Sequence, residues 1–223
     1  MRLPGVSTVS GKYLAGAACA LVCALLYIPL NRFPMFAPRQ LPLTFIDRAV
    51  PFWPLTGWVY VATFAFMLWA FVSTRDLERV TRFLYACTFV QAIAALCFYL
   101  YPVTFPRQLY PVPGDASWLG AAITAFQRGI DQPTNCLPSL HVTTDLLCVV
   151  LIGPARRVAF LLSIPLAVLL SLSILTFKQH YVVDALAGLV LGSLAGGIFF
   201  CWDGLHIGSS APAGRASPAA ERR

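Results

Sequence analysis

The chain has 223 residues, of which 58% are hydrophobic and only 11% are charged. A soluble domain usually carries about 25% charged residues, so the composition excludes an ordinary soluble protein and favours a membrane protein. The net charge of +7 does not indicate a nucleic-acid partner, because the basic residues are spread along short loops and form no patch or arm. In a membrane protein such residues set the orientation and contact anionic lipid headgroups.

Six apolar runs indicate membrane-spanning helices, which need about 20 mostly apolar residues. In chain order they cover residues 13–30, 56–73, 83–101, 139–153, 157–176 and 181–201. The fourth run is short and polar at its start. The first run follows two basic residues, as in a signal peptide, but no clear cleavage site precedes a soluble domain, so we interpret it as a retained helix. The predicted fold class is therefore all-α, a polytopic membrane protein with six transmembrane helices.

The sequence predicts one transmembrane domain over residues 1–205 and a tail over residues 206–223. The tail is small, polar and Pro-containing, which predicts disorder. The placement of Lys and Arg predicts that both termini are cytoplasmic, because ten of these residues then lie inside and six outside. The outer side then receives the loops 31–55 and 102–138 and the short turn 177–180.

Cysteine and glycine spacings add two structural expectations. The seven Cys residues include no CxxC pair, so we expect neither a zinc ribbon nor a structural disulfide. Gly188 and Gly192, continued by Gly196, form a small-xxx-small stripe in the last apolar run. Such a stripe predicts close packing of this helix against another.

His180 and Asp184 are the first candidate catalytic pair. Residues four apart lie on one face of a helix, so the carboxylate can accept a hydrogen bond from one ring nitrogen and leave the other nitrogen as a nucleophile. A carboxylate inside a membrane span costs roughly 2.5–3.5 kcal/mol on insertion scales, so Asp184 should have a partner. The alternative is a His–Asp pair that only braces two helices.

The stretch CLPSLHVTTD, at residues 136–145, supplies the second histidine. Pro138 suits the first turn of a helix, and Ser139 suits a cap or a hydroxyl donor. Exposed amide groups at a helix start attract anions. A phosphate there would meet Ser139 and His141, and the topology places this helix start on the same membrane face as His180. His141 would then protonate a leaving oxygen while His180 attacks phosphorus.

NCLPSLHVTTD and TFKQHYVVDALAG together resemble the type-2 phosphatidic acid phosphatase superfamily, and more closely its inositol phosphorylceramide synthase-like (inositolphosphotransferase) branch. Its Pro-Ser-x-His block is matched here by residues 138–141. Its Ser-Arg-x5-His-x3-Asp block is matched by Ser173, His180 and Asp184. The resemblance covers roughly residues 40–201 and implies a six-helix, phosphatidic acid phosphatase/chloroperoxidase-like core. It also implies His180 as a nucleophile that forms a phosphohistidine, Asp184 as its orienting residue and His141 as the general acid.

Two departures from the family pattern bear on function. Ile174 stands where the third block has Arg, and the Lys-x6-Arg-Pro block is absent, with Arg107 in YPVTFPRQ as the nearest candidate. Arg107 and Lys178 are the candidate phosphate-binding cations, although Lys178 also suits the headgroup layer. The transferase-like branch also lacks the third-block Arg, which favours transfer of a phosphoryl or phospho-headgroup moiety between lipids over hydrolysis. A simple lipid-phosphate or isoprenyl-pyrophosphate phosphatase stays open.

Asp145 lies four residues after His141, so it either contacts that ring and helps to bind substrate or pairs with another helix.

Asp47 and Arg48 suit a headgroup pocket or an interfacial anchor. Arg128 and Asp131 are expected at the loop surface. Trp53, Trp58 and Trp118 read as interfacial belt residues.

Two other function classes remain. A metal-dependent membrane enzyme would use His141, His180, Asp184 and Cys136 as ligands, which are acceptable types for zinc. A non-catalytic transporter or scaffold would show inverted repeats, and we find no convincing one. We therefore expect a lipid-acting enzyme of the bilayer without metal or cofactor, with its active site on the extracytoplasmic face. The sequence predicts neither the donor and acceptor lipids nor an oligomeric state.

Overall fold

The computed structural model describes residues 2–201 and 206–208, and nearly all of its regular structure is helical. The helices are α1 (Val9–Arg32), α2 (Phe45–Ala49), α3 (Thr56–Ser73), α4 (Leu77–Leu100), α5 (Trp118–Ile130), α6 (Leu140–Ile152), α7 (Arg157–Thr176) and α8 (Val182–Gly196). The short 3-10 turn η1 (Arg107–Leu109) follows α4, and the π-helical turn η2 (Gly197–Cys201) continues α8. Two short strands, β1 (Arg2–Pro4) and β2 (His206–Gly208), pair in parallel.

Five helices are long and apolar enough to cross a bilayer: α1, α3, α4, α7 and α8 with its extension η2. Large apolar side chains on them face outward, for example Leu14 at 74%, Val158 at 72% and Leu162 at 65% exposure. Long apolar helices that turn many such side chains outward are typical of a protein surface that lipid surrounds. The chain is an integral membrane protein.

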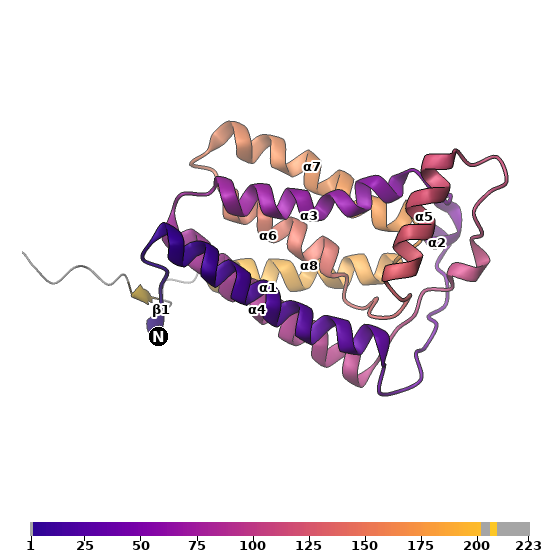
Figure 1. Cartoon of the computed structure of the whole chain (residues 1–223), viewed down its shortest axis with the longest axis horizontal. Coiled ribbons are helices and arrows are strands. Elements are labelled where there is room, and N and C mark those ends of the chain that lie inside the picture. Colours follow the sequence, from indigo (N-terminus) through magenta and orange to yellow (C-terminus); the bar gives the residue numbers. More distant parts are fainter. Residues whose placement is uncertain (1, 202–205, 209–223) are drawn as a thin grey trace, which may run out of the picture.

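Helix α6 occupies the centre of the bundle and packs against α3, α4, α7 and α8 (Figure 1). Leu147, Cys148 and Leu151 on it are fully buried. Its 13 residues span about 20 Å at 1.5 Å per residue, short of the roughly 30 Å of bilayer hydrocarbon. Because its neighbours surround it, it does not need the length of a lipid-facing helix. A sixth crossing through α6 therefore stays a prediction.

The observed helix bounds agree in part with those expected from the apolar runs. Helices α3 and α7 have the bounds expected from the apolar runs, whereas α1 and α4 begin earlier than expected. Helix α4 starts at Leu77 because the Asp76 carboxylate accepts hydrogen bonds from the amides of Glu78 and Arg79, at 3.0 and 3.1 Å. Capping residues of this kind are polar, so they extend a helix beyond its apolar run. Helices α2 and α5 were not expected.

Helices α6 and α8 are in close contact through the predicted glycine stripe. A Cβ atom built on Gly188 would lie 2.4 Å from the Ser139 carbonyl oxygen, and one on Gly192 would lie 3.2 Å from the Thr143 carbonyl oxygen. The Thr143 hydroxyl donates to the Gly188 carbonyl at 2.9 Å. The structure confirms the small-residue packing and shows that it brings Ser139 to the start of α8.

The bundle has two distinct ends, visible in Figure 1. The first, which we call the site end, carries α2, α5 and the turn between α7 and α8. The other end carries β1, the α3–α4 loop and the α6–α7 loop. Of the predicted tail, His206–Gly208 form β2, and the remainder lies outside the described residues.

Candidate functional site

The turn between α7 and α8 positions the predicted nucleophile. Lys178 adopts a left-handed backbone with φ of 55°, and the Gln179 amide donates to the Ile174 carbonyl at 2.9 Å. Helix α8 starts only at Val182, so His180 lies in the turn and not on the helix as its spacing suggested. The Tyr181 amide donates to Asp184 at 2.9 Å and the Val182 amide donates to Asp47 at 2.8 Å. Two carboxylates thus cap the start of α8, where the helix dipole favours negative charge.

The ring of His180 is oriented by two acceptors on one nitrogen. Its Nδ1 lies 3.3 Å from Asp184 Oδ2 and 3.0 Å from the Cys136 carbonyl oxygen. Both partners accept hydrogen bonds, so Nδ1 carries the proton and the lone pair lies on Nε2. Within the described residues Nε2 has no hydrogen-bond partner, and the ring is 8% exposed. The arrangement leaves Nε2 chemically free to attack an electrophile.

The loop before α6 brings Ser139 beside this turn. Its amide donates to the Asp184 carbonyl at 3.0 Å, so the start of α6 is tied to the start of α8. Ser139 occupies the N-cap position, but its hydroxyl makes no capping bond. That hydroxyl is buried and has no partner among the described residues. Buried polar groups are normally satisfied, so a free one marks a position for a ligand or water.

His141 faces His180 across the site. The two ring centroids are 6.1 Å apart, with an angle of 59° between the rings. Tyr60 on α3 stacks on His141 at 4.1 Å, and Phe64 meets it edge-on at 5.8 Å. The Nε2 atom of His141 is buried without a partner in the described chain. The structure thus brings together the three predicted catalytic residues from two separate segments.

Arg107 is held from two directions, by Asp131 and by Gln179. Its guanidinium donates to the Asp131 carbonyl at 2.7 Å, to the Asp131 carboxylate at 3.4 Å and to the side-chain oxygen of Gln179. The residue is 8% exposed, and its Nε has no partner in the part of the chain that the structure describes. Because Gln179 immediately precedes His180, this contact connects the positive charge of Arg107 to the turn that carries the predicted nucleophile.

Lys178 is buried within the protein. Its ammonium donates to the Asp47 carbonyl at 2.7 Å and lies 4.6 Å from the ring centre of Tyr110. Burial lowers the pKa of Lys178, and the nearby Asp47 partly opposes that change. These contacts connect α2 to the turn that carries His180, so they suit a structural role at least as well as phosphate binding.

Asp145 makes its hydrogen bond with a neighbouring helix. The Ser171 hydroxyl on α7 donates to Asp145 Oδ2 at 3.3 Å, and Oδ1 is buried without a partner among the described residues. Of the two expectations for Asp145, the geometry corresponds to pairing with another helix. A role in substrate binding stays a prediction.

Ile174, which stands where the family pattern has Arg, is fully buried. It packs with Tyr60, Val142 and Phe177 in one apolar cluster. An arginine would place an unpaired charge in this cluster, which is strongly unfavourable. The wall of the site next to His141 is therefore apolar.

Cys136, His180 and Asp184 form a potential metal-ligand group, with ligand atoms within 4.8 Å of one another. His141 is not part of it, unlike in the metal-site hypothesis. Burial, and secondarily the charge of Asp184, raises the pKa of the Cys136 thiol well above its usual value. A metal would have to displace that proton as well as the Nδ1 hydrogen bonds of His180. The three ligand types suit zinc, and a metal bound there would compete with the orientation of the His180 ring.

Four residues that bear on the site were missed or undervalued in the sequence. Asp131 was expected at the loop surface but holds Arg107, Tyr60 stacks on His141, Gln179 contacts Arg107 and Asp47 caps α8. Only the position of Gln179 beside His180 gave a local signal. The other three act through contacts with segments distant in sequence.

The helices from α3 to α8 that build this site also match a known family. Residues 55–198, well over half of the chain, match the family model described as the PAP2 superfamily. The chain belongs to the PAP2 superfamily, whose members are generally phosphatases. Membership supports an enzyme of the phosphatase or phosphotransferase type. A comparison with curated proteins gave no significant match.

Proposed function

We propose that this protein is a lipid phosphotransferase or phosphatase that works through a phosphohistidine on His180. The observation that carries the proposal is the position of two hydrogen-bond acceptors on Nδ1 of His180. Both hydrogen bonds fall on Nδ1, which directs the Nε2 lone pair to nucleophilic attack. His141 lies across the site at 6.1 Å between ring centroids, a separation on the scale that a phosphoryl group between a nucleophile and an acid requires.

In the first step, Nε2 of His180 attacks phosphorus and the bond from phosphorus to the leaving alcohol oxygen breaks. His141, whose protonated form is favoured by the bound anionic phosphate, gives its proton to that oxygen. In the second step, neutral His141 takes a proton from water or an acceptor hydroxyl, whose oxygen attacks phosphorus. The phosphorus–nitrogen bond breaks and His180 is restored. Asp184 holds the ring and stabilises the positive charge that His180 gains.

The charge around the site favours transfer of a phospho-headgroup from a phosphodiester lipid. Arg107 contacts the turn of His180, the ammonium of Lys178 in that turn is engaged by the Asp47 carbonyl, and Ile174 stands where the family pattern has a further Arg. A phosphomonoester carries about −1.5 to −2 charges near neutral pH, whereas each diester phosphate carries only one. One guanidinium suits the lower charge. The resemblance to the inositolphosphotransferase branch supports the same class, with a lipid hydroxyl as acceptor. A simple lipid-phosphate phosphatase is the second candidate.

Product analysis separates the two candidates. The purified protein is incubated with a phosphodiester lipid labelled in its headgroup, with and without an acceptor alcohol, and the lipids are analysed by mass spectrometry. A new phospholipid that requires the acceptor supports transfer. In a parallel incubation with a phosphomonoester lipid, free phosphate as the main product would favour the phosphatase. A protein inert toward all such lipids would revive the non-catalytic transporter or scaffold.

His180→Ala and Asp184→Asn test the mechanism. We expect His180→Ala to abolish turnover and labelling of the protein by phosphate. Asp184→Asn should lower kcat by at least about a hundredfold, because the correct tautomer is no longer held. Thermal unfolding in detergent checks that both variants fold. Turnover that persists in folded His180→Ala would refute the phosphohistidine. Loss of wild-type activity in a strong chelator would instead support a metal at Cys136, His180 and Asp184.

A further inference from the structure

Helix α5 has an inverted distribution of polar and apolar side chains. Every exposed residue on it is apolar or glycine, and these residues are Trp118, Leu119, Ala122, Ala125, Phe126, Gly129 and Ile130. Trp118 is 77% and Phe126 is 58% exposed. The buried face instead includes the polar residues Thr124 and Gln127. A water-facing helix would show the opposite pattern.

Both ends of α5 are tied to the ends of membrane-spanning helices. Arg32, the last residue of α1, donates to the Ile130 carbonyl at 2.6 Å. Trp58, in the first turn of α3, donates its indole N–H to the Leu119 carbonyl at 3.3 Å. Figure 1 shows α5 running across the site end of the bundle rather than along it. These contacts place α5 at the level where two spans leave the hydrocarbon.

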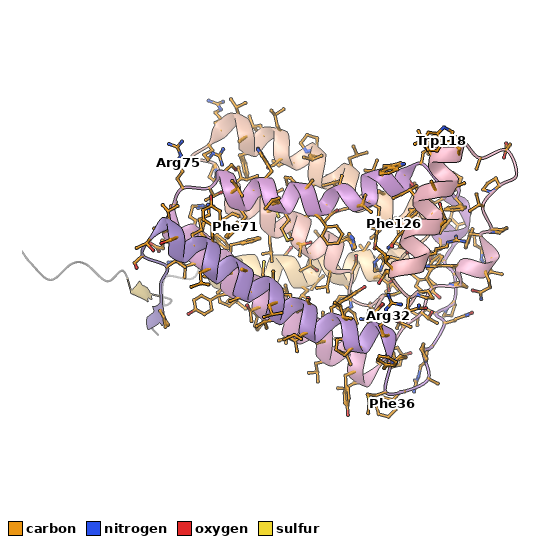
Figure 2. All side chains as sticks on the ribbon, in the orientation of Figure 1. Arg32, Phe36, Phe71, Arg75, Trp118 and Phe126 are labelled. Atoms are coloured by element: carbon orange, nitrogen blue, oxygen red, sulfur yellow. The ribbon has the colours of Figure 1, made fainter. Side chains whose placement is uncertain are left out.

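The outward face of α5 continues the apolar surface of its neighbours. Trp53 is 64%, Leu55 49% and Trp58 49% exposed where the chain enters α3. Figure 2 shows Trp118 and Phe126 at the same end of the molecule as Arg32 and Phe36, and away from Arg75. Tryptophan at the boundary of a span and basic residues beside it are typical of a membrane interface.

We propose that α5 is an interfacial helix whose exposed apolar face lies in the lipid leaflet at the site end. The bilayer, rather than a protein partner, covers this face. A helix of this kind lies in the interface plane with its apolar side about 5–10 Å deep. The contacts of α5 with Arg32 and Trp58 already hold it at the membrane interface, so its apolar side can reach this depth without any change in the fold.

The inner face of α5 links this lipid contact to the site. The Gln127 amide donates to the Asp131 carboxylate at 3.3 Å, and the Asp131 amide donates to the Gln127 carbonyl at 3.1 Å. Asp131 in turn holds Arg107. A bilayer that supports α5 therefore supports the position of Arg107. This second step rests on the proposed function, whereas the location of α5 does not.

Tryptophan quenching tests the location. Phe126→Trp and the control Asp115→Trp, in the exposed loop before α5, are reconstituted in vesicles of phosphatidylcholine brominated near the glycerol end of its acyl chains. We expect the added emission of Phe126→Trp to be quenched at least twofold more than in unbrominated vesicles. The added emission of Asp115→Trp should be unchanged by bromine and quenched by aqueous iodide. Iodide quenching of Phe126→Trp would overturn the proposal, as would protection from both quenchers, which indicates a second copy of the chain on this face.

A charge on the outward face tests the link to Arg107. Phe126→Glu should lower kcat/KM for a vesicle-bound lipid by about tenfold or more, whereas the apolar Phe126→Leu and the control Asp115→Lys should remain near wild type. Full activity in a folded Phe126→Glu whose neighbouring Trp118 still responds to brominated lipid would overturn the link. If the chain shows no lipid turnover at all, the quenching result still decides the location, so failure of the proposed function is distinguished from failure of this inference.

Discussion

Arg107 reaches the turn of His180 through a single side chain, the amide of Gln179. Charge-assisted hydrogen bonds are about twice as strong as neutral ones, so one well-held guanidinium can replace part of a larger phosphate clamp. Asp131 holds Arg107 through both its backbone carbonyl and its carboxylate. The site thus keeps a cation in place in the absence of the family's third-block arginine.

Arg107→Ala should lower kcat/KM about tenfold to a hundredfold, since hydrogen bonds to charged groups contribute roughly 1.5–3 kcal/mol. The loss should appear mainly in KM if the guanidinium binds substrate and transition state alike. Arg107→Lys keeps the charge and should recover part of the activity. Initial rates across a donor-lipid concentration series measure these changes.

Arg128→Ala provides the matched control. Arg128 lies in the last turn of α5, and its guanidinium donates to the Tyr110 carbonyl at 2.8 Å, outside the histidine pair. The kcat/KM of Arg128→Ala should remain close to the wild-type value. Equal losses for the two alanine variants would show that Arg107 acts only through the general charge or stability of this end of the molecule.

Contact between α6 and α8 determines the distance between the two histidines. His141 lies in the first turn of α6, and His180 and Asp184 flank the start of α8. Any side chain at position 188 would clash with the Ser139 carbonyl. The Ser139 amide also donates a hydrogen bond to the Asp184 carbonyl. The small-residue stripe therefore serves the geometry of the site as well as packing.

Gly188→Ala should separate α6 from α8 and so reduce both stability and activity. Overpacking of this kind typically costs about 1–3 kcal/mol, and kcat should fall further than the folded fraction explains. Gly196→Ala is the control, because a Cβ there would meet Val150 at an ordinary 3.7 Å. Thermal unfolding and initial rates measured on both variants test this. Near-identical behaviour of the two would contradict the proposed role of Gly188.

Helix α5 is an element that the hydropathy of the sequence alone does not predict. Its 13 residues are too few for a span, and polar residues interrupt its apolar run. The direction of its polar face becomes meaningful only once the bundle shows that this face points inward. Helix α6 has the same length, but its signature residues marked it in the sequence.

Orientation in the membrane is a property of the whole molecule. The distribution of Lys and Arg predicts that the site end is extracytoplasmic, and Figure 2 shows Arg75 at the opposite end. An outward-facing site would act on lipids of the outer or lumenal leaflet. The fold is compatible with either orientation, because the bundle has the same contacts in both.

Cysteine labelling in intact cells tests this orientation. Asp115→Cys should react with a membrane-impermeant maleimide before permeabilisation, whereas Arg75→Cys should react only afterwards. Both positions are exposed, and labelling of the wild-type chain gives the background from its native cysteines. The reverse pattern would place the site in the cytoplasm and contradict the charge-based prediction.

The sequence by itself determined the membrane character and most of the spans, and it singled out His141, His180 and Asp184 as candidate site residues. It did so because apolar length and short motifs are local properties of the chain. The tertiary structure decided which nitrogen of His180 is free, what holds Arg107, why Ile174 excludes a second arginine and which way α5 faces. Each of these depends on contacts such as Asp131 with Arg107 or Tyr60 with His141. Such contacts join segments far apart in sequence, so only the packing of the helices specifies them.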